Sequence, residues 1–384
     1  MKKTACLFDE KTQTPEGMVS VSQLQTFMSC PKKWEYNYID KLKPRVERAY
    51  LTIGKLCHKG MQTAMTLKWQ VDRGVINRST HDILWLSLMA MEIEWGHYVE
   101  STDLLDSEIP DLEQILADAK AVFEQAFWEF DIDRYHVLSV FDGVQEKPAL
   151  ELHFVVPCAG SKGLHGFIDA ILLDTETGCV WCTDYKFRKS LSPDEEEAFN
   201  VQNAVYSYAA FNVQNAVYSY ACQKMGIDIT GTITWQHINT PAAEPQLLKN
   251  GGVSRAKIKT TWNKYRDFCL NNGIDPDPYE EEMQEKLADI EWYRVTCEYR
   301  NPETIKNIWD NVIIPASRAV AKARNPKTKC YKNLYPWNCK MCQYQSLCQG
   351  ELRNYDVEAI KLREYTTRAE SDNKVIDEGI TSVV

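Results

Sequence analysis

The sequence lacks several features that would place it in a familiar class. It has no run of about 18 apolar residues of the kind that crosses a membrane. Its first residues, Met1-Lys2-Lys3 and a mixed stretch with Asp9 and Glu10, lack the apolar core of a signal peptide. It has no Gly-x-x-x-x-Gly-Lys-Ser/Thr motif, the nucleotide-binding loop of ATP-driven motors. We therefore expect a cytoplasmic protein with no membrane segment and no motor within this chain.

Positive charge is also scarce, since the net charge is −10. Phosphate binding needs a positive surface, so this total argues mildly against a nucleic-acid partner. Two local stretches are nevertheless basic, and each predicts either a DNA-binding face or an ordinary solvated surface. From Asn311 to Gly350 there is no acidic residue, while basic residues stand at Arg318, Lys322, Arg324, Lys327, Lys329, Lys332 and Lys340. The second stretch carries Arg255, Lys257, Lys259, Lys264 and Arg266.

The 13 cysteines are odd in number and mostly scattered, which does not indicate a disulfide framework. Only the C-terminal group, Cys339-x-x-Cys342-x5-Cys348, has the spacing of metal ligands. Cys30 stands far upstream, and Cys330 is a rival ligand. Thiolates in this arrangement bind either zinc or an iron–sulfur cluster, and the spacing alone leaves both open.

Periodicity predicts an α/β core wrapped by helices rather than two independent domains. Helices are expected at about 20–30, 32–39, 54–67, 83–99, 112–130 and 195–225, and strands at about 149–156, 163–173, 179–187 and 230–238. The expected divisions are a leader (1–18), N-terminal helices with a helical insertion (19–145), the α/β core (146–245), a basic helical region ending in the cysteine group (246–350) and a tail (351–384).

A 12-residue repeat interrupts this pattern. AFNVQNAVYSYA occupies 198–209 and recurs unchanged at 210–221. Twelve residues turn an α-helix by roughly 120° beyond three full turns, so the two copies cannot face the same site in one helix. A single tandem copy is not a solenoid, and its perfect identity favours a recent in-frame duplication.

Charged and polar groups stand in or near the predicted strands. Asp169 lies within an apolar strand, Asp184 and Lys186 close the next strand, and His58 precedes them on a helix. A carboxylate in a buried strand is costly unless it is paired or binds a cation. Two such carboxylates with an imidazole would suit Mg²⁺ or Mn²⁺. Asp184 and Lys186 are two residues apart, so their side chains leave the same face of the strand.

His58, Asp169, Asp184-Tyr185-Lys186 and a following Gln-x-x-x-Tyr together resemble the motifs of PD-(D/E)XK nucleases of the RecB type. The segment from Ser20 through Cys30-Pro31 resembles the first helices of that family. The resemblance covers about 19–350, and the insertion at about 68–145 matches nothing. It implies a restriction-endonuclease-like core, with a central mixed sheet flanked by helices.

The resemblance also implies roles for the residues. His58, Asp169 and Asp184 would hold Mg²⁺ or Mn²⁺, and Lys186 would assist the attacking water. A Gln-x-x-x-Tyr helix would position DNA, and both Gln202–Tyr206 and Gln214–Tyr218 fit that motif. We favour Gln214 and Tyr218, because the second copy runs directly into the next strand, as is usual in the family.

Iron–sulfur members of the family, such as the AddB nuclease domain and CRISPR-associated RecB-like exonucleases, carry one cysteine before the core and three after it. Cys30, Cys339, Cys342 and Cys348 match this order, which moves the expectation from zinc to a [4Fe-4S] cluster that ties the first helices to the last ones.

The resulting hypothesis is a metal-dependent DNA exonuclease acting on ends or single strands in recombination, repair or replication. A separate helicase or recombination protein would supply any unwinding, and the setting would be a prokaryote or a phage-infected host. The alternatives are a catalytically silent DNA-binding or scaffold subunit with the same fold and cluster, and a zinc-stapled protein unrelated to nucleases.

Overall fold

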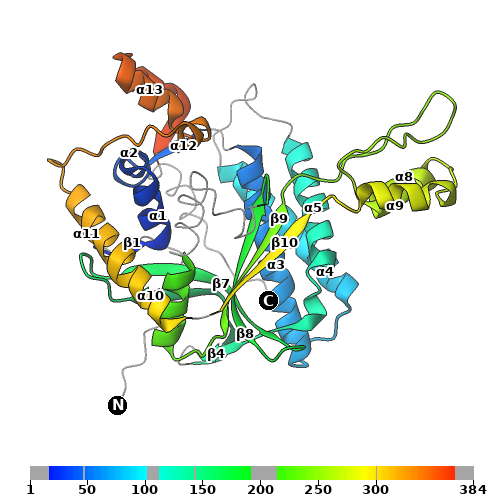
Figure 1. Ribbon diagram of the computed structural model, residues 1–384, viewed down its shortest axis with the longest axis horizontal. Coiled ribbons are helices and arrows are strands. Elements are labelled where there is room, and N and C mark those ends of the chain that lie inside the picture. Colours follow the sequence, from blue (N-terminus) through cyan, green and yellow to red (C-terminus); the bar gives the residue numbers. More distant parts are fainter. Residues whose placement is uncertain are drawn as a thin grey trace.

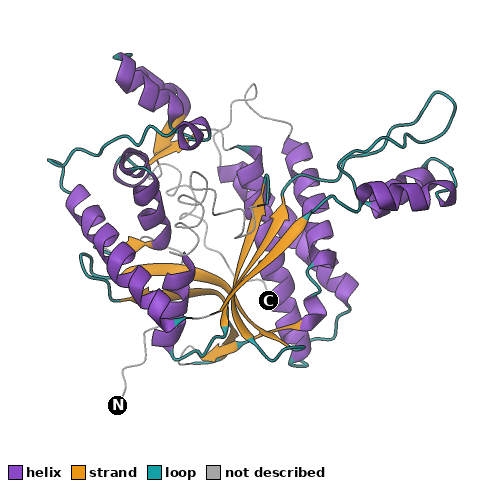
Figure 2. Ribbon diagram, viewed as in Figure 1, coloured by secondary structure: helices purple, strands orange, loops and turns teal. Residues whose placement is uncertain are grey.

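The computed structural model describes residues 17–45, 48–101, 112–141, 144–191, 214–299 and 301–367. A seven-stranded mixed sheet lies at the centre, with helices against both faces (Figures 1 and 2). The strands are β1 (Val19–Ser20), β2 (Leu42–Pro44), β3 (Tyr135–Val137), β4 (Ser139–Phe141), β5 (Glu146–Pro148), β6 (Leu150–Val156), β7 (Leu164–Asp174), β8 (Val180–Arg188), β9 (Gly231–Ile238), β10 (Tyr293–Tyr299) and β11 (Tyr365–Thr367).

The helices include the elements expected from the periodicity. They are α1 (Val21–Ser29), α2 (Pro31–Trp34), η1 (Glu35–Ile39), α3 (Ala49–Asp72), α4 (Thr80–Ser101), α5 (Leu112–Glu129), η2 (Ile132–Arg134), a helix at 214–225, α8 (Trp262–Asn271), η3 (Asp277–Tyr279), α9 (Glu280–Leu287), α10 (Pro302–Ile308), η4 (Trp309–Ile313), α11 (Ile314–Ala323), α12 (Pro336–Lys340), α13 (Gln345–Arg353) and α14 (Val357–Glu364).

The sheet runs in the order β1-β7-β8-β9-β10, with β3 and β6 also paired to β7. Neighbours pair antiparallel except for β1 with β7 and β8 with β9, which are parallel. Every residue of β9 is buried, as expected for a strand covered on both faces. The mixed α/β fold with a central sheet flanked by helices is therefore confirmed.

Two apolar cores lie on opposite faces of the sheet. On one face, α3, α4 and α5 pack over β7, β8 and β9 through residues such as Phe123, Phe130 and Trp235. On the other face, α1, the helix at 214–225 and the α10–α11 segment pack over β6, β7 and β8 through residues such as Trp34 and Val217. The helical insertion thus completes one layer of the domain, which explains why its periodic apolar residues could be recognised from the sequence.

The chain extends the fold in two places beyond the expected divisions. Within the expected basic helical region, β10 adds an antiparallel strand to the sheet, with Val295 opposite Trp235. Within the expected tail, α14 and β11 are ordered elements, and β11 pairs with β2 through Tyr365 and Pro44. Residues 357–367 thus form regular elements within the range expected as a tail. Short polar elements gain their stability from pairing partners far away in sequence, which local pattern does not reveal.

A small unit projects from the sheet between β9 and β10 (Figure 1). It comprises α8, α9 and their loops and has a separate apolar cluster, which includes Val253, Tyr265 and Met283. The sheet residues therefore do not depend on this unit for their own core.

Candidate functional site

Asp169 and Asp184, the two acids expected at the site, lie where the sheet forks. Strands β7 and β8 pair only from Leu173↔Val180 to Ala170↔Thr183. Beyond this point β7 continues beside β6 and β8 continues beside β9. The register places Asp169 and Asp184 one step past the last pair, facing each other as the strands part. The fork leaves backbone groups without a ladder partner, and polar side chains can take their place.

The Asp169 side chain forms a hydrogen bond with one of these backbone groups. Its Oδ2 accepts a hydrogen bond from the backbone N–H of Tyr185 across 2.8 Å. The same oxygen lies 3.7 Å from Nδ1 of His58. Burial raises the pKa of the Asp169 carboxyl, and the neighbouring Asp184 charge raises it further, while His58 and Lys186 oppose this rise. The protein groups around Asp169 and Asp184 therefore compensate the negative charge of the two carboxylates only in part.

Asp184 is 3% exposed and accepts two hydrogen bonds on one oxygen. Lys186 Nζ lies 2.6 Å from Asp184 Oδ1, and the side-chain amide of Gln214 lies 2.9 Å from the same atom. The amide also donates to the Tyr218 hydroxyl across 2.9 Å. The structure thus brings four predicted site residues together. Lys186 and Gln214 both contact the Asp184 carboxylate, and Tyr218 contacts Gln214.

His58 reaches the fork from α3. Gly54 precedes it by one helical turn and faces Phe187 of β8, where an added Cβ would lie 3.6 Å from the backbone oxygen, an ordinary contact distance. The His58 ring packs edge-on against the rings of Tyr185 and Phe187. This packing directs Nδ1 toward Asp169, as the sequence analysis expected for a residue of the same site.

Two residues near the fork were not singled out from the sequence. Arg188 is two residues beyond Lys186, and burial lowers the pKa of its guanidinium while Asp184 opposes this shift. Because side chains alternate between the two faces of a strand, Arg188 could have been expected on the same face as Asp184 and Lys186. Gln25 on α1 approaches Gln214, with 3.5 Å between its amide nitrogen and Gln214 Oε1. No local pattern could have indicated this second residue, because the contact spans the whole core.

The other copy of the repeat, with Gln202 and Tyr206, lies outside the described residues. Of the predicted 195–225 helix, the structure describes residues 214–225. Residues 214–221 belong to the second copy of the repeat, and 222–225 follow it. Its buried side chains include Val217, Ala221 and Cys222.

The four predicted cysteine ligands line one cavity of about 650 Å³. Cys30 lies at the junction of α1 and α2, Cys339 lies in α12, and Cys342 and Cys348 lie in the following segment. Burial raises the pKa of the Cys342 and Cys348 thiols. The rival Cys330 does not line this cavity and instead packs against the larger core.

Contacts around this cavity join the two ends of the described chain. Glu351 lies within 2.8 Å of Lys332 and 3.5 Å of Lys32. The hydroxyl of Tyr344 donates to the backbone oxygen of Leu42 across 2.8 Å, and its ring stacks on that of Tyr365. The N- and C-terminal segments therefore pack together through side chains as well as around the cysteines.

Within the described ranges, no three His, Cys, Asp or Glu side chains meet closely enough to hold one metal ion. At the fork, Lys186 Nζ lies beside Asp184, at a position where a metal cation would compete with it for the carboxylate. The donor set itself, two carboxylates and an imidazole, suits a hard divalent cation such as Mg²⁺ or Mn²⁺.

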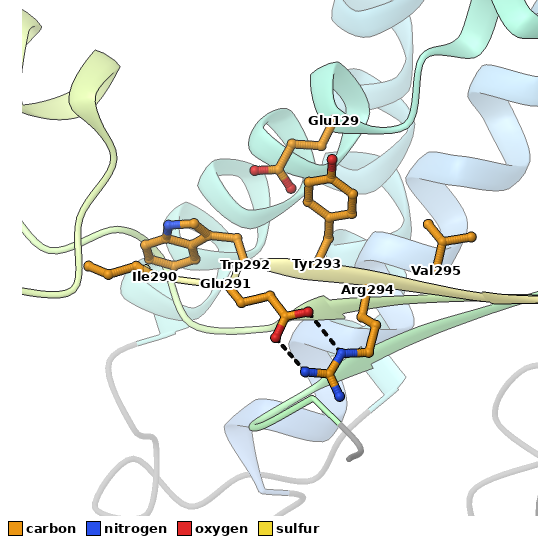
Figure 3. Close-up of a pocket in the computed structure, with 7 residues that line it drawn as sticks. All are labelled: Glu129, Ile290, Glu291, Trp292, Tyr293, Arg294 and Val295. Carbon is orange, nitrogen blue, oxygen red and sulfur yellow. Dashed lines mark hydrogen bonds and ion pairs between the residues drawn. The ribbon is translucent and has the colours of Figure 1, made fainter. Parts of the chain in front are cut away.

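Another pocket, of about 530 Å³, lies over β10 and the end of α5 (Figure 3). Arg294 in this pocket pairs with Glu291, and Glu129 Oε2 lies 2.9 Å from Nε2 of the buried His237. None of the predicted site residues lines it. We therefore place the candidate site at the fork of the sheet.

The two basic stretches differ in their surroundings. Four of the five basic residues in the second stretch form ion pairs, namely Arg255–Glu282, Lys257–Asp289, Lys264–Glu244 and Arg266–Asp267. In the first stretch, Lys332 pairs with Glu351, but Lys322, Lys327, Lys329 and Lys340 form no ion pair with any described residue. The first stretch is therefore the more positive surface. No helix in the described ranges is long and apolar enough to cross a membrane.

The chain was compared with families of known proteins. Residues 18–349 match the family described as the PD-(D/E)XK nuclease superfamily. No curated protein matches the chain.

Proposed function

From the premise that the chain belongs to the PD-(D/E)XK nuclease superfamily, we propose that it is a Mg²⁺- or Mn²⁺-dependent DNA exonuclease acting on ends or single strands. The observation that carries this proposal is the meeting of Asp169 and Asp184 at the fork of the sheet, with His58 beside one and Lys186 beside the other. Buried carboxylates at such close quarters destabilise a fold unless a cation offsets their charge.

His58, Asp169 and Asp184 would hold the divalent cation, which when bound polarises a phosphate and favours ionisation of a water molecule. Lys186 is 2.6 Å from Asp184 and carries donors but no acceptor when charged. With Asp184 engaged by the cation, the charged Lys186 would be free to donate a hydrogen bond to the attacking water, and only its neutral amine form could take a proton from that water. Gln214 and Tyr218 would fix the Asp184 carboxylate and the adjoining DNA strand.

For the cysteine cavity we favour a [4Fe-4S] cluster over zinc. Tetrahedral zinc with bonds near 2.3 Å would hold the thiolate sulfurs within about 4 Å of one another. In a cluster each thiolate binds a different iron atom, so the ligands stand further apart around a larger volume. The four cysteines line one cavity of about 650 Å³, which supports a shared metal group, and the order of one cysteine before the core and three after it favours the cluster.

One observation favours a second candidate, a catalytically silent DNA-binding subunit. Asp184 is already neutralised by Lys186 and satisfied by Gln214, an arrangement that a purely structural acid would also show. The presence of Asp169 argues against it, because a silent protein gains nothing from a second, largely buried carboxylate at the same place.

A cleavage assay separates the candidates. End-labelled linear DNA and covalently closed circular DNA are incubated with the intact protein and Mg²⁺ or Mn²⁺, beside Asp184→Ala and Lys186→Ala variants. An exonuclease degrades the linear substrate only, and both substitutions abolish the activity. Cleavage that survives both substitutions contradicts the proposed site. Binding without cleavage of either substrate by the wild type favours the silent subunit.

A further inference from the structure

The loop between α11 and α12 has an unusual outward face. Exposed and half-buried residues alternate from Lys327 to Lys332, where a turn at Lys327 and a bend at Thr328 lead into a segment without regular secondary structure, and Lys327, Lys329 and Tyr331 form its exposed row. Tyr331 is 68% exposed, so most of its aromatic side chain is open to solvent. Neither lysine forms an ion pair with any residue in the described part of the chain. The row therefore joins two uncompensated positive charges to an accessible aromatic ring.

The backbone of this loop is held firmly although its outer side chains are exposed. The carbonyl of Tyr331 accepts a hydrogen bond from the backbone N–H of Lys32 across 3.1 Å. The side chain of Asn333 donates to the carbonyl of Ser29 across 2.8 Å. Lys332 turns inward to Glu351. A ring carried on a fixed backbone loses little conformational entropy on binding, and this favours recognition.

The loop also lies close to the candidate site along α1. Gln25 approaches Gln214, which contacts Asp184. Ser29, which contacts the loop, is four residues further along the same helix, or about 6 Å. Figure 1 shows the segment between α11 and α12 passing over α2, next to α1. A strand leaving the fork along α1 would therefore meet the loop.

We propose that the outward row of Lys327, Lys329 and Tyr331 binds single-stranded DNA, with the lysines on phosphates and the Tyr331 ring stacked on a base. This inference rests on the proposed nuclease function and adds a substrate-binding surface outside its metal site. Lysines alone attract any nucleic acid. The aromatic ring selects single strands, because the bases inside a duplex are already stacked on each other and cannot receive it.

Binding without cleavage tests this surface. The intact protein is titrated, in the presence of a chelator of divalent ions, into a fluorescein-labelled oligothymidylate, and closed circular duplex DNA is added as competitor. Tyr331→Ala should weaken the affinity for the oligothymidylate roughly 5- to 100-fold and leave the affinity for the competing duplex unchanged. Tyr331→Trp restores the affinity. Lys329→Ala weakens both and reduces the salt dependence for the single strand by about 0.7 in slope.

Tyr355→Ala is the matched control, because that ring is also largely exposed, at 57%, in the same C-terminal part of the chain. It leaves both affinities unchanged. The proposal is overturned if Tyr331→Ala binds the oligothymidylate like the wild type, or if it loses single strand and duplex equally. A wild type that binds the oligothymidylate through Tyr331 but cuts no DNA with Mg²⁺ or Mn²⁺ would contradict the nuclease function and leave this surface standing.

Discussion

The side-chain amide of Gln214 lies 2.9 Å from Asp184 Oδ1 and 2.9 Å from the Tyr218 hydroxyl. An amide nitrogen has two hydrogens, so both contacts are satisfied at once and the orientation of the side chain is fixed. The helix at 214–225 is thereby tied to β8 at the acid itself.

This contact predicts which copy of the repeat is used. Gln214→Ala removes a hydrogen bond to a charged group, so cleavage should fall about 10- to 100-fold. Gln202→Ala changes the same residue within the same 12-residue sequence and should leave cleavage unchanged. Steady-state cleavage of labelled linear DNA measures both. Equal losses in the two variants would show that both copies contribute, and a loss only in Gln202→Ala would reverse the assignment.

The carboxyl of Asp169 predicts a conflict between stability and function. Its pKa is raised in the folded protein by burial and by Asp184. Such a group stabilises the fold while it is protonated, and that contribution is lost as the pH rises through the raised pKa. At neutral pH and without divalent ions, Asp169→Asn should therefore melt at a higher temperature than the wild type, while losing nuclease activity.

Thermal unfolding with a chelator and with Mg²⁺ checks this. The advantage of Asp169→Asn should shrink toward acid pH, and Mg²⁺ should raise the melting temperature of the wild type alone. A variant that melts below the wild type in chelator would show that the Asp169 charge is already compensated.

Much of this architecture follows from local pattern. Strands β6 to β9 and helices α3 to α5 are long for their kind and rich in apolar residues, and they form close to the ranges expected from the sequence. Ser20 caps the N-terminus of α1, and its side chain accepts a hydrogen bond from the backbone N–H of Gln23. Among the elements that the pattern did not indicate, β10 and β11 pair with strands that are distant in sequence.

In the site, too, some features follow from local sequence and others depend on distant contacts. The order of His58, Asp169 and Asp184-x-Lys186 was visible because each residue type is unusual in its apolar surroundings. The fork in the sheet was not visible, because it depends on where the β7–β8 pairing stops. The contact of Gln25 with Gln214 likewise depends on how α1 packs across the core.

A second carboxylate on β7 serves as a structural contrast. Arg134 donates two hydrogen bonds to Asp174, across 3.0 and 2.7 Å, and lowers the pKa of that carboxyl to about 2. A depressed pKa contributes stability that is present above the unfolded pKa and lost as the pH falls through the folded one. Asp174→Asn should therefore cost about 2 kcal/mol at pH near 7.

Urea unfolding of wild type and Asp174→Asn at several pH values measures the difference. It should be constant near neutrality and shrink between roughly pH 4 and 2. A difference that does not change with pH would mean that Asp174 acts through packing rather than through its charge.

The cysteine cavity predicts a coloured protein. Anaerobically purified wild type should be brown and contain iron and acid-labile sulfide, and Cys342→Ser should lose both. Cys330→Ser should keep them, because Cys330 does not line the cavity. Visible absorbance and metal analysis decide the matter. A colourless wild type with one zinc ion per chain would replace the cluster by zinc, and loss of colour in Cys330→Ser would change the ligand set.

Lys186 gives the most direct test of the central claim, because Lys189 offers a matched control three residues away on an exposed position. Lys186→Met keeps the length of the side chain and removes its charge, and Lys189→Met makes the same change outside the site. Cleavage of linear DNA with Mg²⁺ should fall about 10²- to 10⁴-fold in Lys186→Met and remain at the wild-type rate in Lys189→Met. Undiminished cleavage by Lys186→Met would contradict a nuclease site at the fork of β7 and β8.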